Sequence, residues 1–290
     1  MCNRTITRNQ YSILCNSQSP HWTHKNCSNI RLEHYHNRWT CQLHPLPSST
    51  SPHTTTQRHT PSHPLSNSPS PNCTKQLQLL QLNINGINTK LEELKQLTAD
   101  QLIDIITIQE TKLKPTSKTP KIPGFSPIRQ DRRDKDGGGL LTYVKSNITF
   151  TDIKLPQHCN TNTIETQQIK IHLSNKKHLN IYNMYIAPRD TRNPNHHTLE
   201  NDITNCLNYI LTTDKTILTG DLNTHHCQWY SPTTDHRGQL ISDLLDNSNH
   251  ITLNQNTPTR LPTTANQQPT SPDLTTFLND INRLLTWTTQ

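Results

Sequence analysis

The amino-acid sequence predicts a layered α/β domain in which strands outnumber helices, with a segment of different composition in front of it. From about residue 76 onward, short apolar runs recur with turn signals between them, as in a folded domain. Only a few of these runs have helical spacing, and several strand-like runs end in polar side chains. This combination favours an α/β layer arrangement over a helical bundle.

The expected elements follow one another along this domain. Strands are expected over residues 77–83, 103–108, 140–144, 164–173, 178–186, 216–219, 251–253 and 273–278. Asn88 is expected to cap a short helix whose apolar face holds Leu91, Leu94 and Leu97. Two further helices are expected over residues 195–211 and near 239–247.

Composition divides the chain into three zones. Residues 1–44 hold four of the eight cysteines, residues 45–75 are rich in Pro, Ser, Thr and His, and residues 76–290 carry the apolar runs. The middle zone has too few large apolar side chains to offset its ordering entropy, which predicts a disordered linker. Only 29% of the 290 residues are hydrophobic, so a dense core is expected in the third zone alone.

The net charge of +7 is unevenly distributed. Residues 1–75 contain seven lysines and arginines against Glu33 alone, whereas the other 215 residues are nearly neutral. This concentration of charge favours a polyanion partner for the front segment, and a solvated tail is the alternative that composition leaves open.

Neither a membrane span nor a signal peptide is expected. No run approaches the roughly 20 apolar residues that a spanning helix requires, and the residues after Met1 lack an apolar core. A reducing compartment is therefore the default, in which cysteines serve as ligands or buried thiols rather than disulfides.

The segment from Ile217 to Asn223 is the most informative part of the chain. A β-branched run ends at Gly220, and Asp221 and Asn223 follow at alternate positions. Open α/β sheets place ligand sites at the carboxyl ends of such strands. An Asx turn after an ordinary strand is the competing interpretation, because Asp and Asn favour such turns.

Three other strand ends carry similar side chains, namely Asn83 with Asn85, Glu110, and Asp273. Together with Asp221 these would bring three carboxylates close together, where they repel one another unless a cation or a proton lies between them. Hard oxygen donors select Mg²⁺ or Mn²⁺ rather than Zn²⁺. The sequence therefore predicts a divalent-metal site at the strand ends.

The order of these motifs resembles the endonuclease/exonuclease/phosphatase superfamily, to which DNase I and the apurinic-site endonucleases belong. The motifs are Leu82-Asn83-Ile84-Asn85-Gly86, Gln109-Glu110-Thr111-Lys112 and Gly220-Asp221-Leu222-Asn223. Further details look most like the endonuclease domain of jockey-type non-LTR retrotransposons: the glycines at 137–139, Tyr185-Ile-Ala-Pro188, His225-His226 before Trp229, Arg237-Gly238 and Thr257-Pro-Thr-Arg260. The resemblance implies a DNase I-like four-layer α/β sandwich, a DNA substrate, reverse-transcriptase association and a nuclear location.

The resemblance also assigns a role to each matching position. Glu110 would bind the catalytic Mg²⁺ with help from Asn83 and Asn85, and Asn83 would also face the substrate. Asp221 would orient or deprotonate the attacking water, Asn223 and Tyr185 would contact the scissile phosphate, and Arg189 would reach the DNA backbone. Asp273 matches the carboxylate that orients a catalytic histidine.

One departure from the family pattern concerns that histidine. The superfamily carries a Ser-Asp-His motif beyond the position of Asp273, and this sequence reaches Gln290 without one. The expectation from the sequence is a C-terminally truncated domain that is weakly active or inactive. Ancestry as a nicking endonuclease is thus predicted, and present enzymatic activity is left open.

The first 44 residues resemble a PHD-type zinc finger in which two Zn²⁺ ions are held by interleaved ligands. By position, one ion would be bound by Cys2, His24 and Cys27, and the other by Cys15, Cys41 and His44. Each set has three ligands, whereas structural zinc requires four. A degenerate finger is therefore the expectation.

Two alternatives remain beside the nicking endonuclease. One is a decayed, non-catalytic fragment that binds nucleic acid through its basic front segment. The other is a phosphoesterase of the same fold that acts on a different phosphodiester. The oligomeric state is not predicted.

Overall fold

The protein is described from a computed structural model, in which the chain divides into two units, residues 1–72 and 73–290. The residues that the structure describes are 77–132, 137–173, 176–189, 196–255, 257–262 and 268–278, together with two short strands in the first unit. These are β1 (Ser12–Leu14) and β2 (Trp22–His24), which pair antiparallel. The predicted boundaries of the finger and linker stay predictions.

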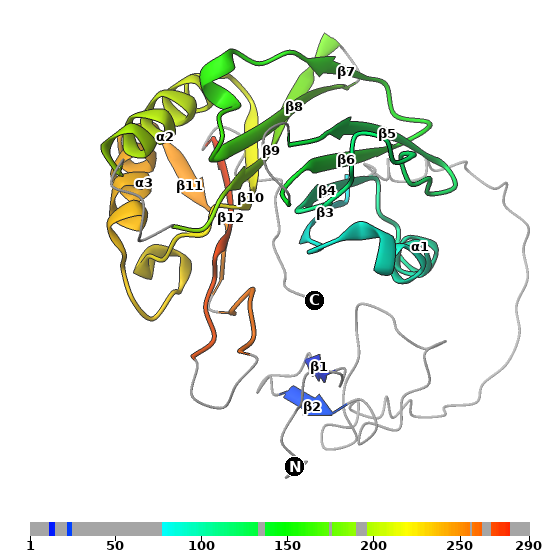
Figure 1. Ribbon diagram of the computed structural model, residues 1–290, viewed down its shortest axis with the longest axis horizontal. Helices are drawn as coiled ribbons and strands as arrows, with labels where there is room; N and C mark the ends of the chain where they lie inside the picture. Colours follow the sequence, from blue (N-terminus) through cyan, green and yellow to red (C-terminus); the bar gives the residue numbers. More distant parts are fainter. Residues whose placement is uncertain are drawn as a thin grey trace, which may run out of the picture. The chain divides into compact units, whose positions relative to one another are not determined.

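A four-stranded sheet forms the first half of the second unit. Its strands lie in the order β3 (Leu79–Asn83), β4 (Ile105–Gln109), β6 (Leu140–Lys145) and β5 (Phe125–Gln130). β3 and β4 are parallel, and the other pairs are antiparallel. Helix α1 (Leu91–Asp100) covers one face, and the 3₁₀ turn η3 (Ile87–Thr89) precedes it. Figure 1 shows α1 beside this sheet.

A six-stranded sheet forms the second half. Its order is β11 (His250–Thr252), β12 (Asp273–Leu278), β10 (Thr216–Asp221), β9 (His178–Ile186), β8 (Ile164–His172) and β7 (Phe150–Ile153). Only the β9–β10 pair is parallel in this sheet. Helices α2 (His196–Leu211) and α3 (His236–Asp246) lie on its outer face (Figure 1). The 3₁₀ turn η4 (Gln157–Cys159) contacts α2, and the 3₁₀ turn η6 (Cys227–Trp229) precedes α3 in the chain.

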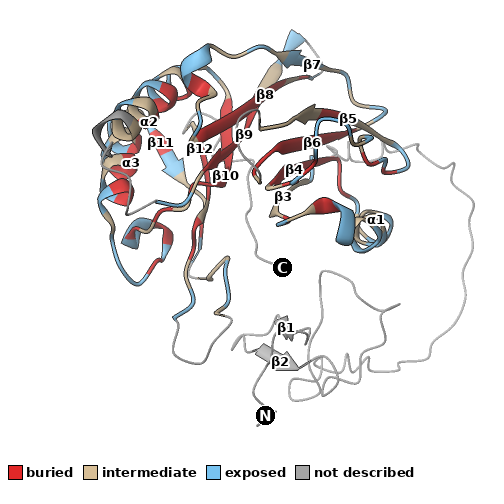
Figure 2. Cartoon of the chain, in the orientation of Figure 1, coloured by how far each residue is buried: buried red, intermediate tan, exposed pale blue. Residues whose placement is uncertain are grey.

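Three apolar clusters hold these layers together. One packs α1 against the four-stranded sheet, with Leu94 of the helix against Ile106 and Ile108 of β4. A second packs α2 and α3 against the six-stranded sheet and contains the buried Trp229. The third lies between the two sheets, because its members come from both: Ile105, Ile128, Val144, Ile169, Ile171 and Ile181. Figure 2 shows strands β4, β6 and β8 coloured mainly as buried. The order helix, sheet, sheet, helices confirms the predicted four-layer α/β sandwich.

The side chains between the two sheets change from apolar to polar along the strands. The third cluster fills one end, at the beginning of β4 and β9. Thr107, Gln109 and Asn183 follow toward the carboxyl ends of these strands, and all three are buried. The site described below lies at that polar end. A buried polar interior must be hydrogen-bonded throughout, which fixes the separation of the two sheets.

Two strands and one helix cap differ from the sequence prediction. β5 and β7 were not predicted, and both lie at sheet edges. β5 contains Pro127, which has no N–H to donate and is therefore tolerated mainly in edge strands. The expectation that Asn88 caps the helix is wrong: Asn88 lies inside η3, and Lys90 precedes α1 without a side-chain cap. Within the described residues, no helix is long and apolar enough to cross a membrane.

Candidate active site

A row of polar side chains crosses the six-stranded sheet at its polar end. Glu165 of β8 pairs with Tyr185 of β9, Tyr185 pairs with Asp221 of β10, and Asp221 pairs with Asp273 of β12. All four side chains point toward the other sheet, because they have the strand parity of the inter-sheet residue Ile181. Cross-strand neighbours in such a row lie about 5 Å apart. Register alone therefore brings three carboxyl groups and a phenol together.

The ends of β3 and β10 have the same local structure. Asp221 Oδ1 accepts a hydrogen bond from the Asn223 N–H at 2.9 Å, and Asn83 Oδ1 accepts one from the Asn85 N–H at 3.1 Å. Asn85 and Asn223 are both in the left-handed region, with φ of 48° and 46°. Both strands thus end in an Asx turn, which Asn tolerates better than most residues. The Asx turn that the sequence offered as the competing interpretation is therefore present, and it does not exclude a site at the same residues.

The Asn83 carboxamide joins the two sheets. Its Nδ2 donates to Asp221 Oδ2 at 2.6 Å and to Glu110 Oε1 at 3.1 Å. One neutral amide therefore lies between two carboxylates from different sheets. Hydrogen bonds of this kind to charged acceptors are stronger than neutral ones.

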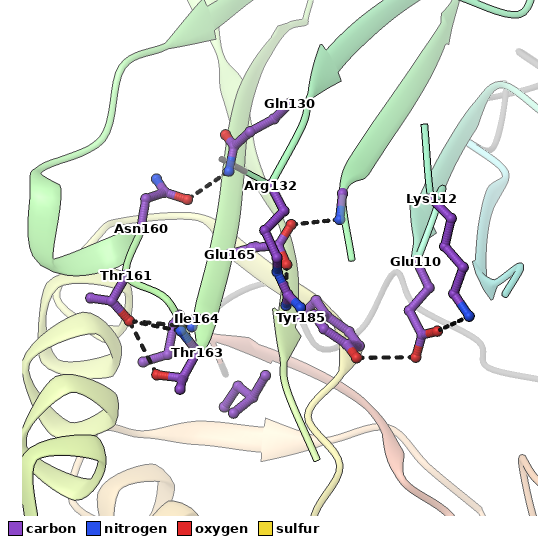
Figure 3. Close-up of polar contacts among 12 residues, drawn as sticks. Glu110, Lys112, Gln130, Arg132, Asn160, Thr161, Thr163, Ile164, Glu165 and Tyr185 are labelled. Carbon is purple, nitrogen blue, oxygen red and sulfur yellow. Dashed lines mark hydrogen bonds and ion pairs between the residues drawn. The ribbon is translucent and has the colours of Figure 1, made fainter. Parts of the chain in front are cut away.

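Glu110 follows β4 and contacts three other site residues. Its Oε1 also accepts from the Tyr185 hydroxyl at 3.1 Å, and its Oε2 lies 3.4 Å from Lys112 Nζ (Figure 3). Glu110 and Lys112 both have a φ of 52°. The glycine loop holds them there, since the N–H of Thr111 donates to the Gly139 carbonyl and that of Lys112 to the neighbouring glycine.

Burial perturbs the carboxyl groups of the row. Desolvation raises the pKa of Asp221 to about 7, with a further increase from the nearby Asp273 and Glu110 carboxylates. Hydrogen bonds from Asn83 and Asn223 oppose this pKa increase. Burial also raises the pKa values of Asp273 and of the Tyr185 phenol. A carboxyl group with a pKa near neutrality suits proton transfer to or from water.

Asp273 is connected to the interior by amides. Its Oδ1 accepts from Gln81 Nε2 at 2.8 Å, and the same nitrogen donates to Gln109 Oε1 at 2.8 Å. Gln109 in turn donates to Asn183 Oδ1 at 2.6 Å. The carboxylate that the sequence assigned to a catalytic histidine is thus held by a buried amide network.

Arg132 is largely enclosed within the site. Its side chain is 11% exposed and forms an ion pair with Glu165, and its guanidinium carbon lies 5.4 Å from the centre of the Tyr185 ring. Glu165 Oε2 also accepts from the Gly139 N–H at 2.6 Å (Figure 3). Gly138 has no room for a side chain, because a Cβ there would overlap both members of the ion pair.

Arg237 holds the loops after β9 and β10 in place. Its Nη1 donates to the carbonyls of Ala187 at 3.0 Å, Asn223 at 3.1 Å and Leu222 at 3.3 Å. Burial lowers the pKa of this guanidinium. Arg189 is exposed just after β9. The Arg237-Gly238 motif therefore has a structural role that its sequence did not reveal.

The structure brings most of the predicted site residues together. Asn83, Glu110, Tyr185 and Asp221 are linked directly by hydrogen bonds, and Asp273 lies beside Asp221 in register. Asn223 borders the group, with its Nδ2 donating to the Ile186 carbonyl at 3.0 Å. The catalytic, substrate-binding and metal-binding roles of these residues stay predictions.

The predicted zinc ligands lie largely outside the described residues. Of the six predicted ligands, His24 belongs to the described part through its backbone, which lies in β2. The other five lie outside the described residues: Cys2, Cys15, Cys27, Cys41 and His44.

The donor set at the strand ends fits a hard divalent cation in an open site. Glu110 offers a carboxylate oxygen and the exposed Asn85 an amide oxygen, and Mg²⁺ binds such oxygens while retaining several waters. Within the described residues, no group of three or more His, Cys, Asp or Glu side chains has the arrangement of a metal cluster. The chemistry therefore matches a water-rich Mg²⁺ or Mn²⁺ site rather than a closed protein cage.

Three residues of the site were not predicted from the sequence. Glu165 is a carboxylate within an otherwise apolar and amide-rich strand, and that anomaly is a signal that could have revealed it. Gln81 interrupts the leucines of β3 in the same way. Lys112 gave no signal, since a lysine after a strand is ordinary.

Two face-to-face sheets covered by helices, with a carboxylate and amide site at their ends, define a DNase I-like α/β sandwich. Residues 179–290 match the family model described as endonuclease-reverse transcriptase. A curated Drosophila melanogaster relative, "Probable RNA-directed DNA polymerase from transposon BS", is 24% identical over 210 residues, which are 69% of this chain and 21% of the relative. The chain thus spans about a fifth of that relative's length.

Solved structures share the fold. The endonuclease domain of TRAS1, a telomere-specific non-LTR retrotransposon, matches with a TM-score of 0.54 and 18% identity, over 72% of this chain and 88% of that one. The AP endonuclease LMAP from Leishmania major matches with a TM-score of 0.58 and 13% identity, over 71% and 80%. An AP endonuclease from Archaeoglobus fulgidus matches with 0.55 and 12%, over 72% and 89%. These likenesses show that the chain has the DNase I-like fold.

Proposed function

We propose that residues 77–278 form a divalent-metal-dependent phosphodiesterase that nicks DNA, the target-site endonuclease of a jockey-type non-LTR retrotransposon acting in the nucleus. The family description and the transposon relative support the retrotransposon origin. The DNA-processing neighbours support the substrate. The nick would supply the 3′-hydroxyl from which reverse transcription begins.

The observation that carries this proposal is the Asn83 amide between Glu110 and Asp221. It fixes a metal-binding carboxylate and a base at one place while keeping their charges apart. Asp221, 5% exposed and with a pKa near 7, would take a proton from the attacking water at neutral pH.

The neighbouring residues would hold the phosphate. The Tyr185 hydroxyl points to Glu110 and is positioned to donate to a phosphate oxygen that displaces this contact. Asn223 borders the same space and offers a second donor. When bound at Glu110 and Asn85, Mg²⁺ would neutralise negative charge that develops on the phosphate.

A plasmid-nicking assay tests the proposal. Supercoiled plasmid should convert to open circles only with Mg²⁺ or Mn²⁺, and Asp221→Ala should abolish this conversion. Protein in excess over plasmid allows a single nick in each plasmid to be detected. The matched control is Asp152→Ala, which removes an exposed carboxylate of edge strand β7 and should leave nicking unchanged. Equal nicking by Asp221→Ala and the unchanged protein would show the proposal wrong.

A second candidate function follows from the charge of residues 1–75. Seven basic residues against one acidic residue favour salt-dependent binding of a nucleic acid without cleavage. DNA binding that disappears when residues 1–75 are deleted, together with no nicking under any metal condition, would favour this candidate. Cleavage of another phosphodiester but not of DNA would instead indicate a different substrate for the same site.

A further inference from the structure

Lys112 contacts both residues to which the metal site is assigned. Its Nζ donates to Asn85 Oδ1. The same Nζ lies 3.4 Å from Glu110 Oε2, a contact that Figure 3 shows. A divalent cation bound to the same two oxygen atoms would occupy the same small region, since its oxygen ligands lie about 2.0–2.2 Å away. The ammonium group therefore lies where the cation would bind.

The backbone conformation fixes the positions of Asn85, Glu110 and Lys112. Asn85, Glu110 and Lys112 all adopt left-handed φ values, which are uncommon outside glycine and cost energy for a long side chain. Backbone hydrogen bonds stabilise the arrangement: the Gly86 N–H donates to the Glu110 carbonyl at 2.8 Å, and the Lys112 N–H donates to the Gly138 carbonyl at 2.9 Å. The position of Lys112 thus follows from the loop geometry.

Only one of the two carboxylate oxygens of Glu110 faces the expected cation position. Oε1 accepts from Asn83 and Tyr185, so Oε2 is the atom that faces an incoming cation. The side chain of Glu110 is 17% exposed and that of Lys112 is 43% exposed, which leaves the ammonium free to swing outward. Two cations cannot share one carboxylate oxygen at contact distance without strong repulsion.

We infer that the Lys112 ammonium occupies the divalent-cation position in the metal-free protein, and that a hard cation such as Mg²⁺ or Mn²⁺ must displace it to bind. Lys112 then sets the metal affinity of the site and keeps Glu110 neutralised while no metal is bound. This inference rests on the proposed function, because it takes the metal site from there.

Manganese binding to the full chain tests the inference by calorimetry, without reference to nuclease activity. Lys112→Met should bind Mn²⁺ about fivefold more tightly than the unchanged protein, the effect of an ion pair worth ~1 kcal/mol. Lys112→Gly should do the same while relieving the backbone strain. Lys112→Arg, which keeps the charge, should not gain affinity.

A matched control separates competition from the general effect of removing a nearby positive charge. Lys90 lies beside the same turn, but its Nζ donates to the Ile84 carbonyl at 2.7 Å rather than to a metal-site oxygen. Lys90→Met should therefore change the Mn²⁺ affinity less than twofold. A circular dichroism melt of each variant establishes that it is folded.

The outcomes are distinguishable. Equal or weaker Mn²⁺ binding by folded Lys112→Met and Lys112→Gly, or an equal gain in Lys90→Met, would overturn the inference and leave the proposed function standing. No Mn²⁺ binding by any variant or by the unchanged protein would contradict the metal-dependent function itself, and the inference with it. If the unchanged protein binds Mn²⁺, Glu110→Gln should lose this binding.

Discussion

Replacing Asp221 with alanine should change the pH dependence of stability in metal-free protein. The folded-state pKa is about 7, against 3.8 for the free side chain. Between these values the folded protein keeps a proton that the unfolded chain has released. The free energy of unfolding of the unchanged protein should therefore fall as the pH rises through this window, and level off above it.

The magnitude follows from the pKa difference. About three pKa units at roughly 1.36 kcal/mol each give a ceiling of about 4 kcal/mol. Asp273 shares in the titration, so part of this free energy belongs to it, and we expect about 2–4 kcal/mol for Asp221. Asp221→Ala also removes the hydrogen bonds from Asn83 and Asn223, but that loss is present at every pH.

Urea unfolding in EDTA at pH 4.5, 6 and 8 measures the effect. The stability difference between Asp221→Ala and the unchanged protein should move in favour of the variant by about 2–4 kcal/mol between pH 4.5 and pH 8. Asp152→Ala, in which an exposed carboxylate is removed, should show a constant difference. A difference for Asp221→Ala that is also independent of pH would refute the reasoning from burial.

Three further predictions concern packing and can be checked by the same urea titrations. Arg132→Met should lose about 3–5 kcal/mol because it leaves the buried Glu165 charge unpaired, and the double variant with Glu165→Leu should recover much of the loss; additive losses would contradict this. Gly220→Ala should lose more than about 3 kcal/mol, since its Cβ would overlap a carbonyl of β9, whereas Gly124→Ala, with open space around it, should lose only about 1 kcal/mol. Leu94→Ala should lose about 2–5 kcal/mol from the α1 cluster.

The sequence predicted those parts of the site that depend on local pattern. The sequence indicated a strand that ends at Asp221 with Asn223 two residues later, and in the structure these two residues form an Asx turn at the end of β10. Strand β9 has the predicted bounds. The central strands were predicted from their apolar or alternating runs of side chains. The edge strands β5 and β7 were not, since each has an exposed side and β5 contains Pro127.

The parts that could not be predicted depend on register and on contacts between sheets. Nothing local to Glu165 indicates that it lies beside Tyr185, because this neighbourhood follows from how β8 pairs with β9. A shift of one residue would turn Glu165 to the other face of its sheet. Arg132 has a loop sequence typical of solvent exposure, and its burial depends on a carboxylate more than thirty residues away.

Hydrogen bonds in the polar interior stabilise the end of the sandwich that holds the carboxylates. From Gln81 onward the hydrogen bonds of the polar interior run in one direction, and each side chain donates to the next. The acceptors in order are Gln109 in the same sheet, then Asn183, Thr142, Gln167 and finally the Ile128 carbonyl, each in the opposite sheet from its donor. Each amide orientation is therefore determined by its neighbour. Replacing any member with an apolar residue would leave the next one unpaired, at about 1–3 kcal/mol. Gln81 also donates to Asp273, so the orientation of a group at the site depends on hydrogen bonds far inside the domain.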